Sequence, residues 1–172
     1  MWYAIQTLGG EEERTANMIR RQVSTDNLSE CFVPKRERMK KFGGQWNQVE
    51  ETLFPGYLFV ITERPEGLYQ ELRRVPRLTK VLGREEQNFY PLSREEEAFV
   101  RGIGDQEHRT SLSKIKLGEG KEIRVVEGPL KDYVGNVVKV NLHKREVVIR
   151  VRFVGRETEL KMGVEMVGVE EH

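Results

Sequence analysis

The stretch Leu53-Phe54-Pro55-Gly56-Tyr57-Leu58-Phe59-Val60-Ile61 decides the fold of the N-terminal half of the chain. Pro55-Gly56 is a break, and the residues after it have high strand propensity. Alternate side chains of a strand face opposite sides of its sheet. One face therefore carries Tyr57, Phe59 and Ile61, and the other carries Leu58 and Val60. Both faces are apolar, which fits either a central strand buried on both sides or a sheet that reserves one face for a partner protein.

A second informative stretch, Val126 to Val140, lies far downstream and reads as two short strands joined by turns. Gly128-Pro129 makes a tight turn, and apolar residues resume at Val137. Gly135 is expected where a side chain would obstruct a bulge or a close approach of two backbones.

Composition gives little information about partners. The chain has 172 residues, with 29 basic and 28 acidic side chains and a net charge of +1, so only local charge clusters can indicate nucleic acid. The single cysteine, Cys31, excludes an intrachain disulfide and suggests no cysteine metal site. No apolar run is long enough to span a membrane, and the N-terminus has no signal-peptide pattern, so we expect a cytoplasmic protein.

Local patterns predict the elements around the first stretch. Residues 2–7 read as a strand, with Tyr3 and Ile5 on one face. A helix is expected from about Glu11 to Val23 with a packing stripe of Ala16, Ile19 and Val23, and another from about Glu66 to Arg73. A short strand should end at Leu82-Gly83. Ser93 and Glu96 have the spacing of a capping box for a further helix that ends near Arg101.

A basic hairpin is predicted between these elements, with its tip at Phe42-Gly43-Gly44-Gln45. Its cationic side chains are Lys35, Arg36, Arg38, Lys40 and Lys41. Such a hairpin can rest against nucleic acid. The alternative is a solvated edge hairpin whose lysines block the addition of further strands.

The C-terminal part has a different pattern. Residues 103–118 show no periodicity and are expected to form a linker. From Glu119 onward the chain reads as short strands only, about five within about fifty residues, which suits a small closed barrel. In the strand that ends near Val154, Ile149, Val151 and Phe153 should face the core, with the arginines between them facing out.

Positive charge gathers locally in this part. Between residues 139 and 156 the only acidic residue is Glu146, and His143 lies in the predicted basic turn at 141–145. The basic residues in this range are Lys139, Lys144, Arg145, Arg150, Arg152 and Arg156. Outward arginines beside a basic turn can bind phosphates and recognise RNA by shape. The alternative is a solvated strand face that pairs with Glu157 and Glu159 across the sheet.

No constellation for catalysis is found. His108, His143 and His172 are too scattered for a metal cluster, and the acidic runs stand at predicted helix starts, where the helix dipole explains them. No glycine-rich loop ends in Lys-Ser or Lys-Thr, which excludes a phosphate-binding loop of that kind. We therefore expect a binding protein without a cofactor, not an enzyme.

Both informative stretches resemble parts of one known family. Gly128-Pro129 with Val137 to Val140 resembles a KOW motif, the core of a small SH3-like barrel. Residues 53–61, with Trp2-Tyr3 before them and Val75-Pro76-Arg77 after them, look like the N-terminal domain of NusG transcription elongation factors. The resemblance implies an α+β N-terminal domain over residues 1–102, with an antiparallel sheet flanked by helices. A linker over 103–118 would join it to an all-β SH3-like KOW barrel over 119–172.

The resemblance also implies partners. NusG-like N-terminal domains bind the clamp helices of RNA polymerase through an apolar patch, whose matching positions here are Trp2, Tyr57, Phe59 and Ile61. Such a factor acts as a monomer, keeps the clamp closed and suppresses pausing, and its basic hairpin would lie near the upstream DNA.

A further resemblance concerns the subgroup. Housekeeping NusG proteins carry an Ile-Phe-Gly-Arg segment that contacts Rho or a ribosomal protein, whereas this chain has Phe153-Val154-Gly155-Arg156. The departure at Val154 favours a specialised paralogue that resembles the LoaP antiterminators, which act on selected operons and use a leader RNA hairpin. The alternatives are a housekeeping elongation factor that couples to Rho or the ribosome, and a ribosome-associated KOW protein that binds RNA.

Overall fold

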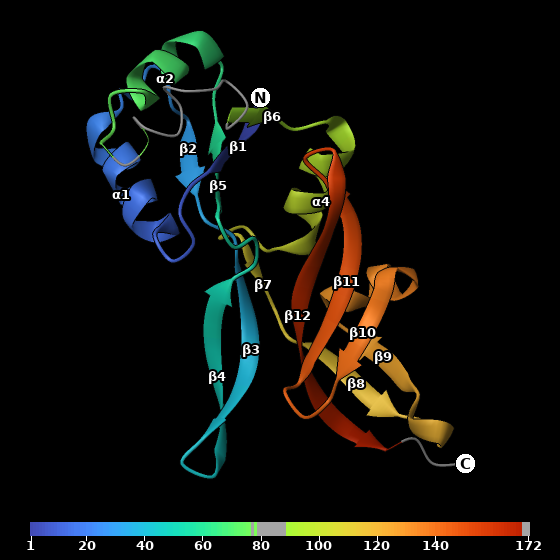
Figure 1. Cartoon of the computed structure of the whole chain (residues 1–172). Helices are drawn as coiled ribbons and strands as arrows, with labels where there is room; N and C mark the ends of the chain where they lie inside the picture. The colour runs from blue at the N-terminus through green and yellow to red at the C-terminus, as the bar shows by residue number, and fades with distance from the viewer. Residues whose placement is uncertain (77, 79–88, 170–172) are drawn as a thin grey trace. The chain divides into compact units, whose positions relative to one another are not determined.

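The computed structural model describes residues 1–76, 78 and 89–169, which form two compact units (Figure 1). The first unit comprises Met1–Pro34 and Phe54–Val100, and the second comprises Lys35–Leu53 and Arg101–His172. The hairpin 35–53 therefore groups with the C-terminal strands, whereas the sequence places it within the N-terminal domain. Arg77 and the strand expected to end at Leu82-Gly83 lie outside the described residues. Among the described helices, none has the length and apolar character needed to cross a membrane.

The first unit is an antiparallel sheet with helices on both faces, as predicted (Figure 1). Its strands, in the order β2-β5-β1-β6, are β2 (Glu30–Phe32), β5 (Tyr57–Ile61), β1 (Trp2–Gln6) and β6 (Phe89–Pro91). Its helices are α1 (Glu12–Gln22), α2 (Pro65–Leu72) and α4 (Arg94–Ile103). In Figure 1, α1 and α2 lie on one side of the sheet and α4 lies on the other. The central position of β5 explains why both of its faces are apolar.

The core of the first unit lies between the sheet and helices α1 and α2. The predicted stripe of Ala16, Ile19 and Val23 is confirmed. It packs with side chains from β1, β5 and α2: Ile5, Leu58, Val60, Leu68 and Leu72. A fully buried side chain of the size of leucine stabilises the fold by about 1.5–3 kcal/mol. This buried cluster therefore fixes α1 and α2 to one face of the sheet. The aromatic residues lie on the opposite face.

Side-chain hydrogen bonds fix the N-terminal ends of α4 and α1. The capping box of α4 is confirmed, because the Ser93 backbone N–H donates to Glu96 at 2.9 Å and the Glu96 N–H donates to the Ser93 hydroxyl at 3.2 Å. In α1, the buried Glu12 carboxylate accepts the Gly56 N–H at 2.9 Å. Gly56 has φ +86°, a conformation that favours glycine. The Pro55-Gly56 break therefore anchors the first turn of α1 to the start of β5.

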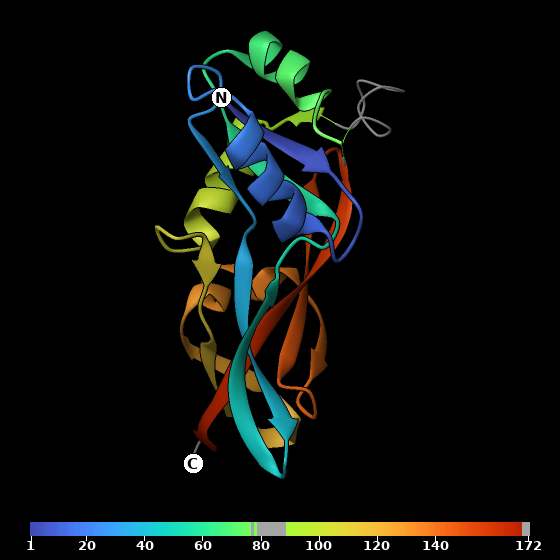
Figure 2. The same ribbon diagram turned by 90° about the vertical axis from the view of Figure 1, so that its left-hand side faces the viewer.

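The second unit contains the predicted hairpin. Strands β3 (Lys35–Phe42) and β4 (Gln45–Thr52) pair in antiparallel register, and β7 (Arg109–Thr110) pairs in parallel with β3. The tip is Gly43-Gly44, with φ values of +60° and +76°, as a two-residue hairpin turn requires. Figure 2 shows the two strands of the hairpin crossing over one another, as the right-handed twist of paired strands predicts.

The rest of the second unit is a five-stranded sheet in the order β10-β11-β12-β8-β9. Its strands are β8 (Ser113–Leu117), β9 (Ile123–Glu127), β10 (Val137–Asn141), β11 (Glu146–Phe153) and β12 (Arg156–Val169), with short 3-10 segments η2 (Glu119–Lys121) and η3 (Pro129–Asn136). The all-β character is confirmed, but a closed barrel is not detected. Within the described residues, β9 and β10 form the two edges of the sheet and do not pair.

The linker prediction differs from the structure at β8. Ser113–Leu117 forms a strand that pairs in parallel with β12 and in antiparallel fashion with β9. Ser113 and Ile115 are buried, and Lys114 between them is exposed, so a period of two is present. The pattern was missed because the flanking charges make the segment resemble a polar loop.

The expectation for Gly135 is wrong, because a Cβ atom there would meet nothing within 4 Å. The close approaches are made by two other glycines. At Gly128, with φ +110°, a Cβ would lie 2.6 Å from the Ser113 Cα. At Gly163, in β12, a Cβ would clash with the Glu37 carbonyl oxygen and lie 2.9 Å from the Arg38 Cα. The backbones of β12 and β3 are therefore in direct contact.

Candidate functional site

An aromatic cluster covers the sheet face of the first unit that lies opposite α1 and α2. Phe59 stacks on Phe32 with ring centroids 5.6 Å apart, and it meets Phe54 edge to face at 5.2 Å. Trp2 contacts Phe32 at 5.4 Å, and Phe54 contacts Phe99 of α4 at 6.4 Å. Edge-to-face and offset pairs of this kind add about 0.5–1.5 kcal/mol each beyond the area that they bury.

The predicted polymerase-binding residues share this face but differ in exposure. Strand register places Ile61 opposite Trp2 and Phe59 opposite Phe32. Phe59 is fully buried and Trp2 is 7% exposed, whereas Tyr57 and Ile61 are half-buried. Phe59 and Trp2 therefore lie beneath the surface of this face, whereas Tyr57 and Ile61 are partly accessible to a partner. Phe32 belongs to the same face and was missed, because its register with Phe59 cannot be read from the local sequence.

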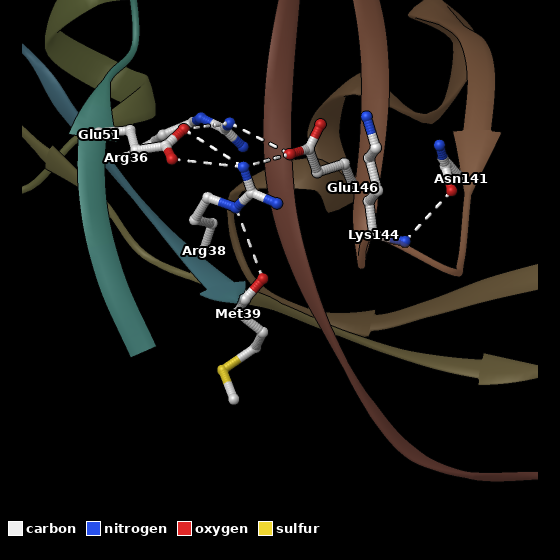
Figure 3. Close-up of polar contacts among 7 residues, drawn as sticks. All are labelled: Arg36, Arg38, Met39, Glu51, Asn141, Lys144 and Glu146. Atoms are coloured by element: carbon white, nitrogen blue, oxygen red, sulfur yellow. Dashed lines mark hydrogen bonds and ion pairs between the residues drawn. The ribbon is translucent and has the colours of Figure 1, made fainter. Parts of the chain in front are cut away.

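The root of the basic hairpin is an ion-pair network (Figure 3). Arg36 Nη2 lies 2.9 Å from Glu51 Oε2 and 3.4 Å from Glu146 Oε1. Arg38 Nη1 lies 2.8 Å from the same Glu146 oxygen and 3.3 Å from Glu51 Oε1. Glu51 is on β4 and Glu146 begins β11, so the network joins the hairpin to the five-stranded sheet.

This geometry corrects the prediction for two of the hairpin arginines. The Arg36 and Glu146 side chains are 4% and 6% exposed, and Arg38 is 15% exposed. Buried charges persist only when they are paired, because their desolvation is costly. Arg36 and Arg38 are therefore neutralised at the hairpin root and are not presented to nucleic acid. Lys35 is half-buried beside them, and its backbone N–H donates to His108 at 2.9 Å.

Other contacts hold the hairpin in the same position. The Glu37 carboxylate accepts the Leu112 N–H at 3.2 Å and a hydrogen bond from the Gln48 side chain. Together with the close backbone contact at Gly163, these bonds fix β3 against the sheet of the second unit. The exposed cations of the hairpin are Lys40 and Lys41, near its tip.

The turn between β10 and β11 carries the second group of predicted residues. His143 and Lys144 are exposed, and the guanidinium of Arg145 lies 4.9 Å from the ring centroid of Trp46 in β4. The Lys41 ammonium lies 5.9 Å from the same ring. The structure therefore brings a residue of the basic turn and a residue of the basic hairpin to one tryptophan.

The remaining predicted cations are Arg150 and Arg152 on β11, Lys139 on β10 and Arg156 at the start of β12. Arg150 and Arg152 are exposed and Ile149 and Phe153 are buried, as the alternation predicts. Arg150 forms an ion pair with Glu159 at 3.0 Å, and Arg152 donates to the Gly155 carbonyl oxygen at 3.2 Å. The solvated-face alternative is thus realised for Arg150. The other two cations, Lys139 and Arg156, are exposed.

No group of three His, Cys, Asp or Glu side chains suited to a metal ion occurs in the part of the chain that the structure describes.

Comparisons with known proteins identify the family of the chain. Residues 1–101 match the family model described as transcription termination factor nusG. Two relatives, each called transcription termination/antitermination protein NusG, are 28% identical. The one from Thermus thermophilus matches over 94% of both chains, and the one from Escherichia coli over 94% of this chain and 91% of its own. A solved structure titled "Domain interaction in Thermotoga maritima NusG" shares the fold, with a TM-score of 0.51, 20% identity and coverage of 94% and 92%. The chain therefore belongs to the NusG family of transcription termination and antitermination factors.

Proposed function

We propose that this protein binds RNA polymerase through the aromatic face of its first unit and suppresses pausing and termination. The contact is with the clamp helices of the polymerase, and Tyr57 and Ile61 touch them while Trp2 and Phe59 shape the surface beneath. The factor acts by binding, since it stabilises one conformation of its partner, and no covalent step is involved. It works in the cytoplasm as a monomer.

The observation that carries this proposal is the composition of the sheet face. One face of β5 packs on α1 and α2. The other face lies in a chain of aromatic contacts that ends on α4: Trp2, Phe32, Phe59, Phe54 and, from α4, Phe99. Aromatic side chains at the centre of a patch, with half-buried residues around them, are the usual anchors of a protein interface. The membership of the chain in the NusG family supports the same assignment.

We further propose that the factor is recruited by a leader RNA hairpin and acts on selected operons, in the manner of the LoaP group. The two units have separate roles in this proposal: the first binds the polymerase, and the second, which includes the hairpin and β8, binds RNA. Support comes from the exposed cations of the second unit, Lys139, His143, Lys144, Arg152 and Arg156 among them. Lys40 and Lys41 are exposed on the hairpin and can bind nucleic acid, either RNA or, as the alternative, upstream DNA.

The polymerase-binding face is tested with surface variants. Phe59→Ala is unsuitable because the side chain is fully buried, and its removal costs about 3–5 kcal/mol of stability. Tyr57→Ala with Ile61→Ser changes only half-buried side chains. We expect this double variant to lose binding to core RNA polymerase by more than about tenfold with its fold intact. Retained binding would exclude the face.

The recruited role is tested by mapping the tagged protein across the genome of its host. Occupancy confined to one or a few long operons, beginning after the leader, supports recruitment by RNA. Occupancy of nearly all transcribed genes supports a housekeeping elongation factor. In that case Val154 does not distinguish a specialised paralogue from a housekeeping NusG protein.

A further inference from the structure

Two cations from different parts of the chain lie close to the Trp46 ring. Lys41 is its cross-strand partner in the hairpin, with the ammonium 5.9 Å from the ring centroid. Arg145 belongs to the turn between β10 and β11, and its guanidinium carbon lies 4.9 Å from the same centroid. Cations within about 6 Å of an indole face are attracted to it, and arginine prefers to stack there. The ring therefore holds two positive charges close together without neutralising either.

The turn that presents Arg145 is held by several hydrogen bonds. The Arg145 N–H donates to the Leu142 carbonyl at 3.1 Å, and its Nη1 donates to the same carbonyl at 2.8 Å. The Lys144 N–H donates to the Asn141 side-chain oxygen at 3.1 Å, and the Val164 N–H donates to the Arg145 carbonyl at 3.0 Å. A surface that is ordered before it binds loses less conformational entropy on binding.

Charges at the two ends of the hairpin differ. At the root, the carboxylates of Glu51 and Glu146 pair with Arg36 and Arg38, and Glu50 pairs with Arg109 at 2.8 Å. Near the tip there is no such compensation. In the described ranges, no carboxylate forms an ion pair with any of four cations around Trp46: Lys40, Lys41, Lys144 and Arg145. His143 is also exposed there. The positive charge of the hairpin is thus concentrated where the hairpin meets the turn.

We propose that the hairpin tip and the β10–β11 turn form one binding site for single-stranded RNA, organised around Trp46. Lys40, Lys41 and Lys144 bind successive phosphates, and the Trp46–Arg145 pair offers planar groups against which an unpaired base stacks. Aromatic rings beside a cationic track are the usual means by which proteins bind single strands, and guanidinium planes also stack on bases. The inference rests on the proposed RNA-binding role, and adds to it that the hairpin belongs to the RNA site.

The test uses the full chain and a labelled single-stranded RNA of about 12 nucleotides and mixed sequence, within the size that single-strand sites cover. Fluorescence anisotropy at several salt concentrations gives the affinity and its salt slope for the wild type, Lys41→Ala and Lys144→Ala. Each variant should lower the slope by about 0.7, the value for one lost phosphate contact on a single strand. Trp46→Ala should weaken binding about tenfold, and Trp46→Phe should retain most of it. Lys131→Ala, an exposed lysine of η3, is the matched control and should bind like the wild type.

The outcomes separate the inference from the function on which it rests. If Lys144→Ala weakens binding and Lys41→Ala does not, the hairpin is outside the site and the inference is wrong, while RNA binding by the second unit stands. If neither lysine variant changes binding but Arg150→Ala does, the RNA lies on the β11 face instead. If the wild type binds an RNA hairpin but not this single strand, the inference is wrong and recruitment by RNA stands; if it binds neither RNA, the proposed recruitment fails as well. Equal competition by duplex DNA would overturn the choice of a single strand.

Discussion

Glu146→Gln is the most informative single change for the architecture of the second unit. The Glu146 carboxylate is 6% exposed and lies 2.8 Å from Arg38 and 3.4 Å from Arg36. Glutamine keeps the size of the side chain and one acceptor oxygen, so the variant removes the charge and little else. Two arginines then share only Glu51, which is 37% exposed.

The magnitude follows from burial. Breaking a buried ion pair by removing one partner costs about 3–5 kcal/mol, because the remaining charge is left uncompensated. The retained acceptor and the second carboxylate reduce this cost, so we expect a loss of about 2–3 kcal/mol in the free energy of unfolding of the second unit. An exposed pair contributes only about 0–1 kcal/mol. Glu159→Gln, which removes the exposed partner of Arg150 at 3.0 Å, is therefore the matched control.

The assay is urea unfolding followed by tryptophan fluorescence. The chain has two tryptophans, Trp2 in the first unit and Trp46 in the second. In a Trp2→Phe background, emission reports the second unit alone, which matters because a chain with two units need not unfold in one step. Both glutamine variants are made in that background. If Glu146→Gln costs no more than Glu159→Gln, the network does not hold the hairpin, and the reasoning from burial is refuted.

Three further predictions concern single residues. Gly163→Ala should destabilise the second unit by about 1–3 kcal/mol, because the added methyl group collides with the Glu37 carbonyl; an unchanged urea midpoint would contradict the close contact. Val154 has φ +53°, which is strained for a β-branched residue, so Val154→Gly should stabilise the protein by about 1 kcal/mol in the same assay. Burial, above all, raises the pKa of Cys31 from 9.0 to about 12, so at pH 8 only on the order of one thiol in 10⁴ is ionised in the folded chain. The thiol should therefore react with a disulfide reagent mainly after unfolding. Since the unfolded chain releases this proton at lower pH than the folded one, stability should fall as pH rises from about 9 to 12.

Local sequence patterns predicted the helices of the first unit and the hairpin of the second, because each of these elements is determined by a few neighbouring residues. The spacing of Ala16, Ile19 and Val23 gave α1, and Ser93 with Glu96 gave the start of α4. The Gly43-Gly44 tip gave the hairpin register. In each case the determining interaction lies within one or two turns of helix or one pair of strands, and periodicity reports such interactions directly.

Interactions between distant residues could not be read in the same way. Arg36 was grouped with the surface lysines because its partner Glu146 is 110 positions away. The glycine at the crowded position is Gly163 instead of Gly135, since crowding there depends on β3, which a local pattern does not reveal. Phe59 was assigned to contact a partner directly, but Phe32 and Phe54 surround it in the folded sheet. Each of these differences comes from tertiary packing that overrides a correct local pattern.

The separation of Arg36 from Glu146 also sets an order of events during synthesis. The hairpin leaves the ribosome early, but Glu146, the second carboxylate of its root network, lies 110 residues after Arg36, and Gly163 follows later still. At the usual elongation rate of about 5–20 residues per second, the interval is roughly 5–20 s. Throughout it, Glu51 is the only one of the two network carboxylates that is present to pair with Arg36 and Arg38. The last strands of this protein therefore complete the neutralisation of the hairpin root, and they do so only late in synthesis.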